Sequence, residues 1–402
     1  ALIYALATVS RFDEVVNVLV HHPEPTGMMS GLTDGYRQAI VGWIQFLKGH
    51  LGKAIRGLGA AQRRLDDSYG RYSTPACVVA GFLAEALYEA NQFQALEVIL
   101  GGRLEVMNER VFFESYIRFL LASSRLQYLN GNEDNSHQLL ERLSAFGQST
   151  GLMRPIASAQ AERVRLLILS SDLPGAKRAM SQLERLWVDD GINVCTQKLG
   201  SLFDIPALVI LSRARCALAE GNPLQALHTL DRLNALTSGQ RLDYFVKVRL
   251  LRSIALQQLG RAEWREVLMS LVGLTAECAM VRSLCDEGPE VYRLLHTLVG
   301  QTGTPSIELH LSQLLQGFGV ALELRSPEQR LLGYSLSARE RDILALLVQG
   351  LPNKRIAIML NISAETVKWY LKKLFSKMGV NDRMHAVDKA RRDNLVAGLP
   401  IR

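Results

Sequence analysis

Along residues 1–318 the apolar positions recur at helical spacing in one segment after another, and no stretch alternates as a strand would. Each short polar turn lies between two helix-length segments, as CVVAGFLAEALYEA and ALEVIL flank the residues NQF. The pattern therefore predicts pairs of helices joined by tight turns. The turns are SRFDEV, GHLGKA, NQFQAL, GNEDNS, SDLPGA and GNPLQAL.

Aligned positions after these turns give the period of the pattern. The aligned residues Val15, Ala54, Ala95, Ser136 and Ala176 are separated by steps of 39, 41, 41 and 40, and Ala226 follows after 50. Self-similarity near about forty residues, built from paired helices, is typical of an α-solenoid. The sequence therefore predicts an all-α chain whose residues 1–318 form a helical-hairpin (TPR-like) superhelical array.

The longer step coincides with an apparently inserted stretch, WVDDGINVCTQKLGSLFDIP, at residues 187–206. Insertions in solenoids map to loops on one face, which is often the binding face. Trp187, Asp189 and Asp190 at its start are therefore candidate effector-binding residues. Two alternatives remain open: the stretch is a longer connection without function, and Trp187 belongs to the core.

After residue 318 the pattern changes. Residues 319–335, which include Pro327 and Gly333, are predicted to be a linker. Ser337 and Glu340 have the spacing of a capping box, in which each side chain bonds the backbone amide of the other residue. Residues 336–402 are predicted to form a separate domain of four helices. Its first helix turns Ile343, Leu346 and Leu347 inward and ends at Gly350.

The middle of this domain predicts a helix-turn-helix. A short helix over about residues 353–360 is followed by a turn, and Ser363 can cap the next helix, from Ala364 to Met378. That helix gathers an apolar stripe on one side: Val367, Leu371, Leu374, Phe375 and Met378. Its other side carries Lys368, Trp369, Lys372, Lys373 and Lys377. A fourth helix is predicted over about residues 382–395.

The positive charge of the chain is localised in this domain. The formal net charge is +7, and residues 335–395 hold 12 Lys and Arg against 6 Asp and Glu. Elsewhere 34 basic residues nearly balance 33 acidic ones. A basic patch so confined is typical of a surface that binds a polyanion.

A basic helix of this length fits the major groove of B-DNA. Lys368 and Lys372, one turn apart near its start, are the candidates for contact with base edges. Trp369 either touches a thymine methyl group or a sugar, or rests against the neighbouring helix. Candidates for phosphate contact are Lys354, Arg355, Thr366, Lys373, Lys377 and Arg383.

Other functional classes find little support in the sequence. Five cysteines form no CxxC pair, which favours reduced thiols in the cytoplasm over disulfides or a zinc site. No phosphate-binding loop GxxxxGK[ST], HExxH or GxSxG motif is present. We therefore expect no enzyme activity, no metal and no cofactor in this chain.

Residues 336–387, LSARERDILALLVQGLPNKRIAIMLNISAETVKWYLKKLFSKMGVNDRMHAV, closely resemble the LuxR-type helix-turn-helix. The matching pieces are LSxRE, GLxNKxIA, the LxIS turn and TVKxxLxxxxxKxGV. The resemblance implies base contacts by Lys368 and Lys372, and a dimer contact on DNA around Met384 and Val387. The sequence departs from the family pattern at Pro352, where a serine is usual, at Arg355, where a glutamate is usual, and at Tyr370, where a histidine is usual.

An array followed by this domain resembles the large MalT-like (LAL) regulators, and CDEGPEVYRLLHTL at 285–298 supports the resemblance. It implies a bacterial transcription regulator, with activation as the expected mode, that senses an effector through the array and lacks here the ATP-binding domain of such proteins. The expected partners are double-stranded DNA, a small-molecule effector or regulatory protein, further copies of the chain and RNA polymerase. We expect no interaction with a membrane. An interaction scaffold anchored to DNA by its C-terminal domain is the alternative.

Overall fold

The computed structural model describes residues 14–15, 17–18, 30–107, 111–187, 204–237, 241–318, 338–360, 363–378, 380 and 382–392. Within these residues it contains 19 helices and no strand, so the all-α prediction is confirmed. The helices form two compact units, one mainly of residues 1–318 and the other mainly of residues 319–402. The predicted linker, 319–335, lies outside the described residues, and its boundaries stay predictions.

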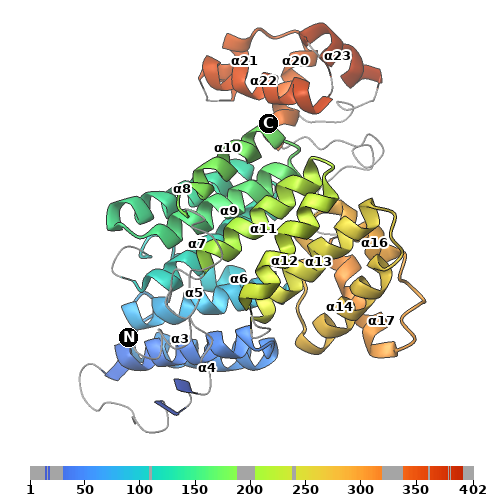
Figure 1. The fold of residues 1–402 in the computed structure, drawn as a ribbon. Coiled ribbons are helices and arrows are strands. Elements are labelled where there is room, and N and C mark those ends of the chain that lie inside the picture. The colour runs from blue at the N-terminus through green and yellow to red at the C-terminus, as the bar shows by residue number, and fades with distance from the viewer. Residues whose placement is uncertain are drawn as a thin grey trace. The chain divides into compact units, whose positions relative to one another are not determined.

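The larger unit is a series of helical hairpins stacked side by side (Figure 1). Helices α3, α5, α9, α11 and α13 each pack against their hairpin partner, and α3–α5, α9–α11 and α11–α13 also pack together. The hairpins are α3 (Ser30–Leu47) with α4 (Leu51–Tyr69), α5 (Thr74–Glu89) with α6 (Phe93–Leu100), α7 (Phe113–Leu129) with α8 (Glu133–Thr150), α9 (Met153–Leu169) with α10 (Leu173–Glu184), α11 (Asp204–Ala219) with α12 (Pro223–Thr237), and α13 (Leu242–Gln258) with α14 (Trp264–Cys278).

The aligned repeat positions are buried in all hairpins but one. Ala54, Ala176 and Ala226 have no exposed surface, and buried Ser136 bonds the Ser124 hydroxyl, 2.9 Å away between the two Oγ atoms. Ala95 is exposed, and Leu96 occupies the buried position instead. The predicted register was therefore wrong by one residue in α6, because a leucine fills a site that is small elsewhere.

A ladder of buried charges joins the first helices of successive hairpins. Its members alternate in charge, and each is ion-paired with the next: Glu85, Arg118, Glu114, Arg154, Asp204 and Arg241. Burial would raise the pKa of Asp204, but Arg154 and Arg241 outweigh it and the pKa is lowered. The ladder links neighbouring repeats, and removing one partner would leave a buried charge uncompensated.

The inserted stretch between α10 and α11 is shorter than predicted. The helix α11 begins at Asp204, so residues 204–206 belong to the repeat rather than to the insertion. Asp204 is buried at the junction, where it accepts a hydrogen bond of 2.7 Å from the Tyr244 hydroxyl. The sequence signal failed here because an acidic residue followed by Ile and Pro resembles a connection.

The last part of this unit folds back onto the first hairpins. It contains the short helix α15 (Arg282–Cys285), α16 (Pro289–His296) and α17 (Pro305–Gly317). Helix α15 packs against α5 as well as against α13 and α17. Across about 190 residues of sequence, the Val281 amide donates to the Glu89 carbonyl oxygen at 3.1 Å.

The smaller unit has four helices around one apolar core: α20 (Ala338–Val348), α21 (Asn353–Met359), α22 (Ala364–Met378) and α23 (Arg383–Arg392). The predicted inward residues Ile343, Leu346 and Leu347 are buried, and Gly350 has the left-handed φ of +81° that ends α20. Glu340 is fully buried, whereas its predicted capping partner Ser337 lies outside the described residues. Among the helices that the structure describes, none is long and apolar enough to cross a bilayer.

Candidate nucleic-acid interface

Helix α22 separates its apolar and basic sides as the sequence predicted. Val367 and Leu374 have no exposed surface, and Leu371 and Met378 are buried with them in the core of the smaller unit. Lys368 and Lys372 are exposed on the other side. Because the apolar stripe is anchored, the helix presents these two lysines from a fixed backbone.

The start of α22 is fixed by a side-chain cap. The Thr366 amide donates to the Ser363 hydroxyl oxygen at 3.0 Å, which confirms the predicted N-cap. The Thr366 hydroxyl lies 2.8 Å from the same oxygen. Thr366 is therefore a capping partner in this structure, and its predicted phosphate contact stays a prediction.

Lys368 forms a weak contact that DNA can replace. Its ammonium group donates to Glu365 at 2.7 Å, one turn back, and the two side chains are 61% and 81% exposed. An ion pair this exposed contributes little to stability. Glu365 therefore positions the Lys368 ammonium group near the start of the helix, and the fold does not depend on this ion pair.

Trp369 lies at the edge of the basic side. Its side chain is 55% exposed, and its ring packs edge-on against Tyr370 with centroids 4.9 Å apart. Tyr370, at the position where the family pattern has histidine, is itself buried. This ring contact lies within α22, so it decides between neither of the two alternatives for Trp369, and both stay predictions.

The preceding helix α21 presents Lys354 and Arg355, both exposed. Pro352 is its N-cap residue and supplies no side-chain hydrogen bond, as expected from the missing serine. The Pro352 carbonyl accepts from the amides of Arg355 and Ile356 at 2.8 and 3.1 Å. The helix therefore starts with backbone bonds alone.

Arg383 has a structural role that the sequence did not reveal. It is half-buried, and its guanidinium donates to the Leu351 carbonyl oxygen at 2.8 Å and to Asn353 Oδ1 at 3.4 Å. These bonds join the start of α23 to the start of α21. Its predicted phosphate contact stays a prediction.

The predicted dimer residues differ in exposure. Met384 is 75% exposed, whereas Val387 is half-buried and packs against the core of its own unit. Only the outer side of Val387 is therefore accessible to a partner. The side chains of Lys373 and Lys377 lie outside the described residues, and their contacts stay predictions.

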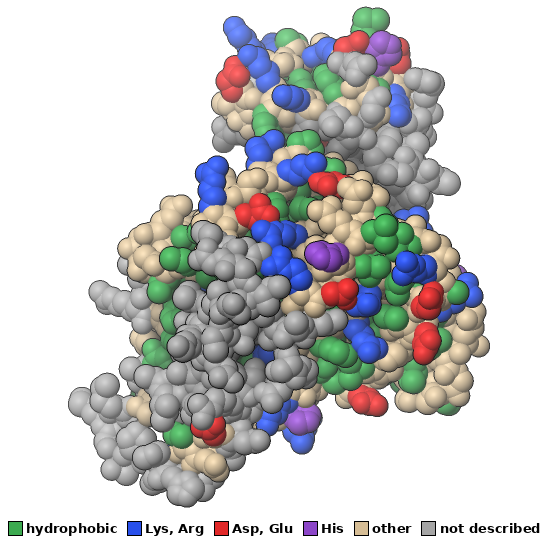
Figure 2. All heavy atoms as spheres, viewed as in Figure 1, with side chains coloured by type: hydrophobic (Ala, Val, Ile, Leu, Met, Phe, Trp, Pro, Cys, Tyr) green, Lys and Arg blue, Asp and Glu red, His purple; other side chains and the backbone are tan. Residues whose placement is uncertain are grey.

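Two exposed apolar residues of this unit were missed. Ile358 and Met359 on α21 are 72% and 52% exposed. In the sequence they continue the apolar pattern around Ile356 and Ala357, which are buried, so periodicity alone gave no sign of their exposure. Figure 2 shows Lys and Arg side chains on the surface of this unit beside apolar ones.

The candidate effector residues are only partly described. Trp187 is half-buried, packs against a cluster around Val164 and Leu183, and lies under the Arg213 guanidinium, 5.9 Å from the ring centroid. These contacts agree with the alternative that it belongs to the core. Asp189 and Asp190 lie outside the described residues.

Comparison with known proteins gives two family matches. Residues 334–390 match the model of bacterial regulatory proteins of the luxR family, and residues 32–301 match that of the MalT-like TPR region. The second match covers more than half of the chain.

Individual relatives agree with both matches. Over 201 residues the chain is 25% identical to the HTH-type transcriptional regulator MalT of Klebsiella pneumoniae, with 45% of this chain and 22% of that protein covered. Over 53 residues it is 51% identical to the probable transcriptional regulatory protein SgaR of Hyphomicrobium methylovorum, with 13% and 25% covered. The chain thus spans about a fifth of the MalT protein that it matches.

Proposed function

The chain belongs to the family with a MalT-like TPR region and carries a luxR-family domain, and on this premise we propose that it is a DNA-binding transcription regulator whose helical array senses an effector. The observation that carries the proposal is the capped, anchored helix α22 with Lys368 and Lys372 exposed one turn apart. In the major groove these ammonium groups donate to guanine O6 and N7.

The wider assignment follows the same premise. We propose that the regulator acts in the cytoplasm as an activator, that copies of it meet on DNA through the face around Met384, and that RNA polymerase is the target of activation. The proposal assigns no catalytic residue and no cofactor to this chain. Lys354 and Arg355 on α21 support it, because exposed basic side chains favour contact with phosphate.

The alternative, a scaffold that binds proteins and uses the C-terminal unit only as an anchor, predicts a broad open groove on the array. The inner face instead holds a cavity lined by charged and apolar side chains from five successive hairpins. This favours a small-molecule effector over a protein partner.

The experiment is a reporter assay in a bacterial host. A duplex selected from a random library by the full chain is placed upstream of a weak promoter, and a scrambled duplex serves as control. The proposal expects the chain to raise transcription from the selected duplex only. Equal reporter levels with and without the chain would contradict its role as a regulator.

A further inference from the structure

A cavity of about 80 Å³ lies on the inner face of the array. Helices α5, α7, α9, α11 and α13 supply its walls, and the turn after α15 closes one side with Asp286 and Glu287. Because one water needs about 10–15 Å³ of such space, the cavity admits only a small organic molecule of a few heavy atoms. The apolar part of the lining comes from Leu121, Ala161, Leu208 and Leu211.

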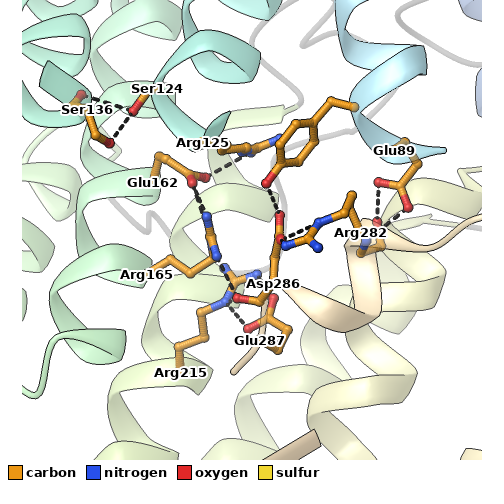
Figure 3. Close-up of polar contacts among 12 residues, drawn as sticks. Glu89, Ser124, Arg125, Ser136, Glu162, Arg165, Arg215, Arg282, Asp286 and Glu287 are labelled. Atoms are coloured by element: carbon orange, nitrogen blue, oxygen red, sulfur yellow. Dashed lines mark hydrogen bonds and ion pairs between the residues drawn. The ribbon is translucent and has the colours of Figure 1, made fainter. Parts of the chain in front are cut away.

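The arginines around this cavity are already paired with carboxylates, as Figure 3 shows. Arg125 donates to Glu162 at 2.8 Å, and Arg165 shares the same carboxylate at 3.1 Å. Arg215 holds Glu287 through its Nε at 2.9 Å. In the same way Arg282 bonds Asp286 at 2.9 Å, so each of the four guanidinium groups is already in an ion pair, although the Nε of Arg125 is a buried donor without a partner among the described residues.

Lys247 is different from these arginines. It lines the cavity, and within the part of the chain that the structure describes no hydrogen bond or ion pair joins its ammonium group to another residue. The side chains that line the cavity include four cations (Arg125, Arg165, Arg215 and Lys247) and four carboxylates (Glu89, Glu162, Asp286 and Glu287). The lining is therefore neutral when every carboxylate is ionised, and it carries one excess positive charge when Glu89 is protonated.

One of the four carboxylates is only weakly acidic. Burial raises the pKa of Glu89 to about 7, against the hydrogen bonds from Ser283 and the charge of Lys247. The Glu89 oxygens accept from the Ser283 amide and hydroxyl, both at 2.9 Å. The Glu89 carboxylate therefore forms its hydrogen bonds with the start of α15 and not with Lys247.

A second polar group faces the cavity without a partner. Ser158 is 6% exposed and lines the cavity, and no hydrogen bond of its hydroxyl is formed among the described residues. The hydroxyl can therefore donate a hydrogen bond to a ligand or accept one from it. Leu208 and Leu211, on α11, lie on the helix between α9, which carries Ser158, and α13, which carries Lys247.

We propose that this cavity binds a small organic acid, whose carboxylate pairs with Lys247, whose second polar group bonds the Ser158 hydroxyl, and whose apolar part packs against Leu208 and Leu211. A single ammonium group suits a monoanionic carboxylate, whereas a phosphate dianion favours the guanidinium forks, which are occupied here. This inference rests on the proposed function, because it names the chemical class of the effector.

The test is calorimetric titration of the full chain with short-chain hydroxy, keto and dicarboxylic acids, the matching neutral amides, and inorganic phosphate. We expect saturable binding of at least one acid and none of its amide. Lys247→Met is expected to weaken that binding by at least about tenfold, and Ser158→Ala to weaken it less. The control Lys53→Met changes an exposed lysine on α4 and should leave binding unchanged.

Three results would overturn the inference: no binding of any acid up to about 10 mM, where even millimolar affinity is measurable, equal binding of acid and amide, or tighter binding of phosphate. Unchanged acid binding by Lys247→Met, with the thermal midpoint of the wild type, would also overturn it. DNA binding is measured on the same preparations. If DNA binding persists while no acid binds, the effector class is wrong and the proposed function stands. If an acid binds but DNA does not, the proposed function is contradicted instead.

Discussion

At the scale of single residues, the DNA-binding proposal depends on two lysines that are not needed for the fold. Lys372 is exposed on α22, and Lys368 is held only by an exposed ion pair. Both side chains can therefore reorient toward DNA at little cost. Arg383, in contrast, bonds the start of α21, so its replacement would disturb the unit itself.

Replacing Lys372 with Ala should weaken binding to the selected duplex by about 1–3 kcal/mol and blur the preference at one base pair, because a bidentate contact to guanine is lost. Fluorescence anisotropy on the selected duplex and on its single-base variants measures both effects. Lys53→Ala, which removes an exposed lysine from the array, is the matched control. If Lys372→Ala kept both affinity and preference, the docking of α22 would be wrong.

Residue-level prediction from the sequence succeeded where a local rule applies. The apolar stripe of α22 and the cap at Ser363 follow from helical spacing and from capping chemistry. It failed at Ala95 and did not reveal the structural role of Arg383, because long-range packing decides at both positions. Neither the leucine at the small position of α6 nor the bonds from Arg383 to residues 351 and 353 leave a signal in their own neighbourhood.

At the scale of elements, the short helix α15 and the turn after it are the least expected part of the fold. The sequence marks residues 285–298 only through a family resemblance. In the structure the Glu89 carboxylate accepts a hydrogen bond from the Ser283 amide at the start of α15. The Tyr88 hydroxyl donates to Asp286 at 2.9 Å, and Arg215 is ion-paired with Glu287. The segment thereby joins the second hairpin to the end of the array.

The contribution of Glu89 to the free energy of unfolding should depend on pH. Because the pKa of Glu89 is raised from 4.5 to about 7, the folded protein binds a proton more tightly than the unfolded chain. The contribution is fully present below pH 4.5 and is lost as the pH rises through about 7, by up to about 3 kcal/mol. Ser283, Lys247 and Asp286 face this carboxyl group and modulate the shift.

The measurement compares the thermal midpoints of the wild type and Glu89→Gln from pH 5 to 8. Glutamine keeps an acceptor for the Ser283 amide but does not titrate, so the wild type should lose stability relative to the variant as the pH rises. All other titrating groups are common to both proteins and cancel in the comparison. A difference that stays constant over this range would show that Glu89 keeps one protonation state.

At the scale of the whole molecule, the order of an array followed by a basic four-helix domain could be predicted because each part carries its own pattern. The period of about forty residues specifies paired helices, and charge localisation separates the last domain. The inner cavity could not be predicted, because its wall combines Glu89, Ser158, Lys247 and the turn at 286–287. No local pattern links residues so far apart in the chain.

The central claim is that the C-terminal unit reads DNA sequence, and one measurement tests it most directly. The full chain is titrated into the selected duplex and into a scrambled duplex of equal length and composition, at several salt concentrations. The account predicts at least about 1,000-fold tighter binding to the selected duplex at physiological salt. Equal affinity for both duplexes, falling together as salt rises, would show phosphate contact alone and would contradict the account.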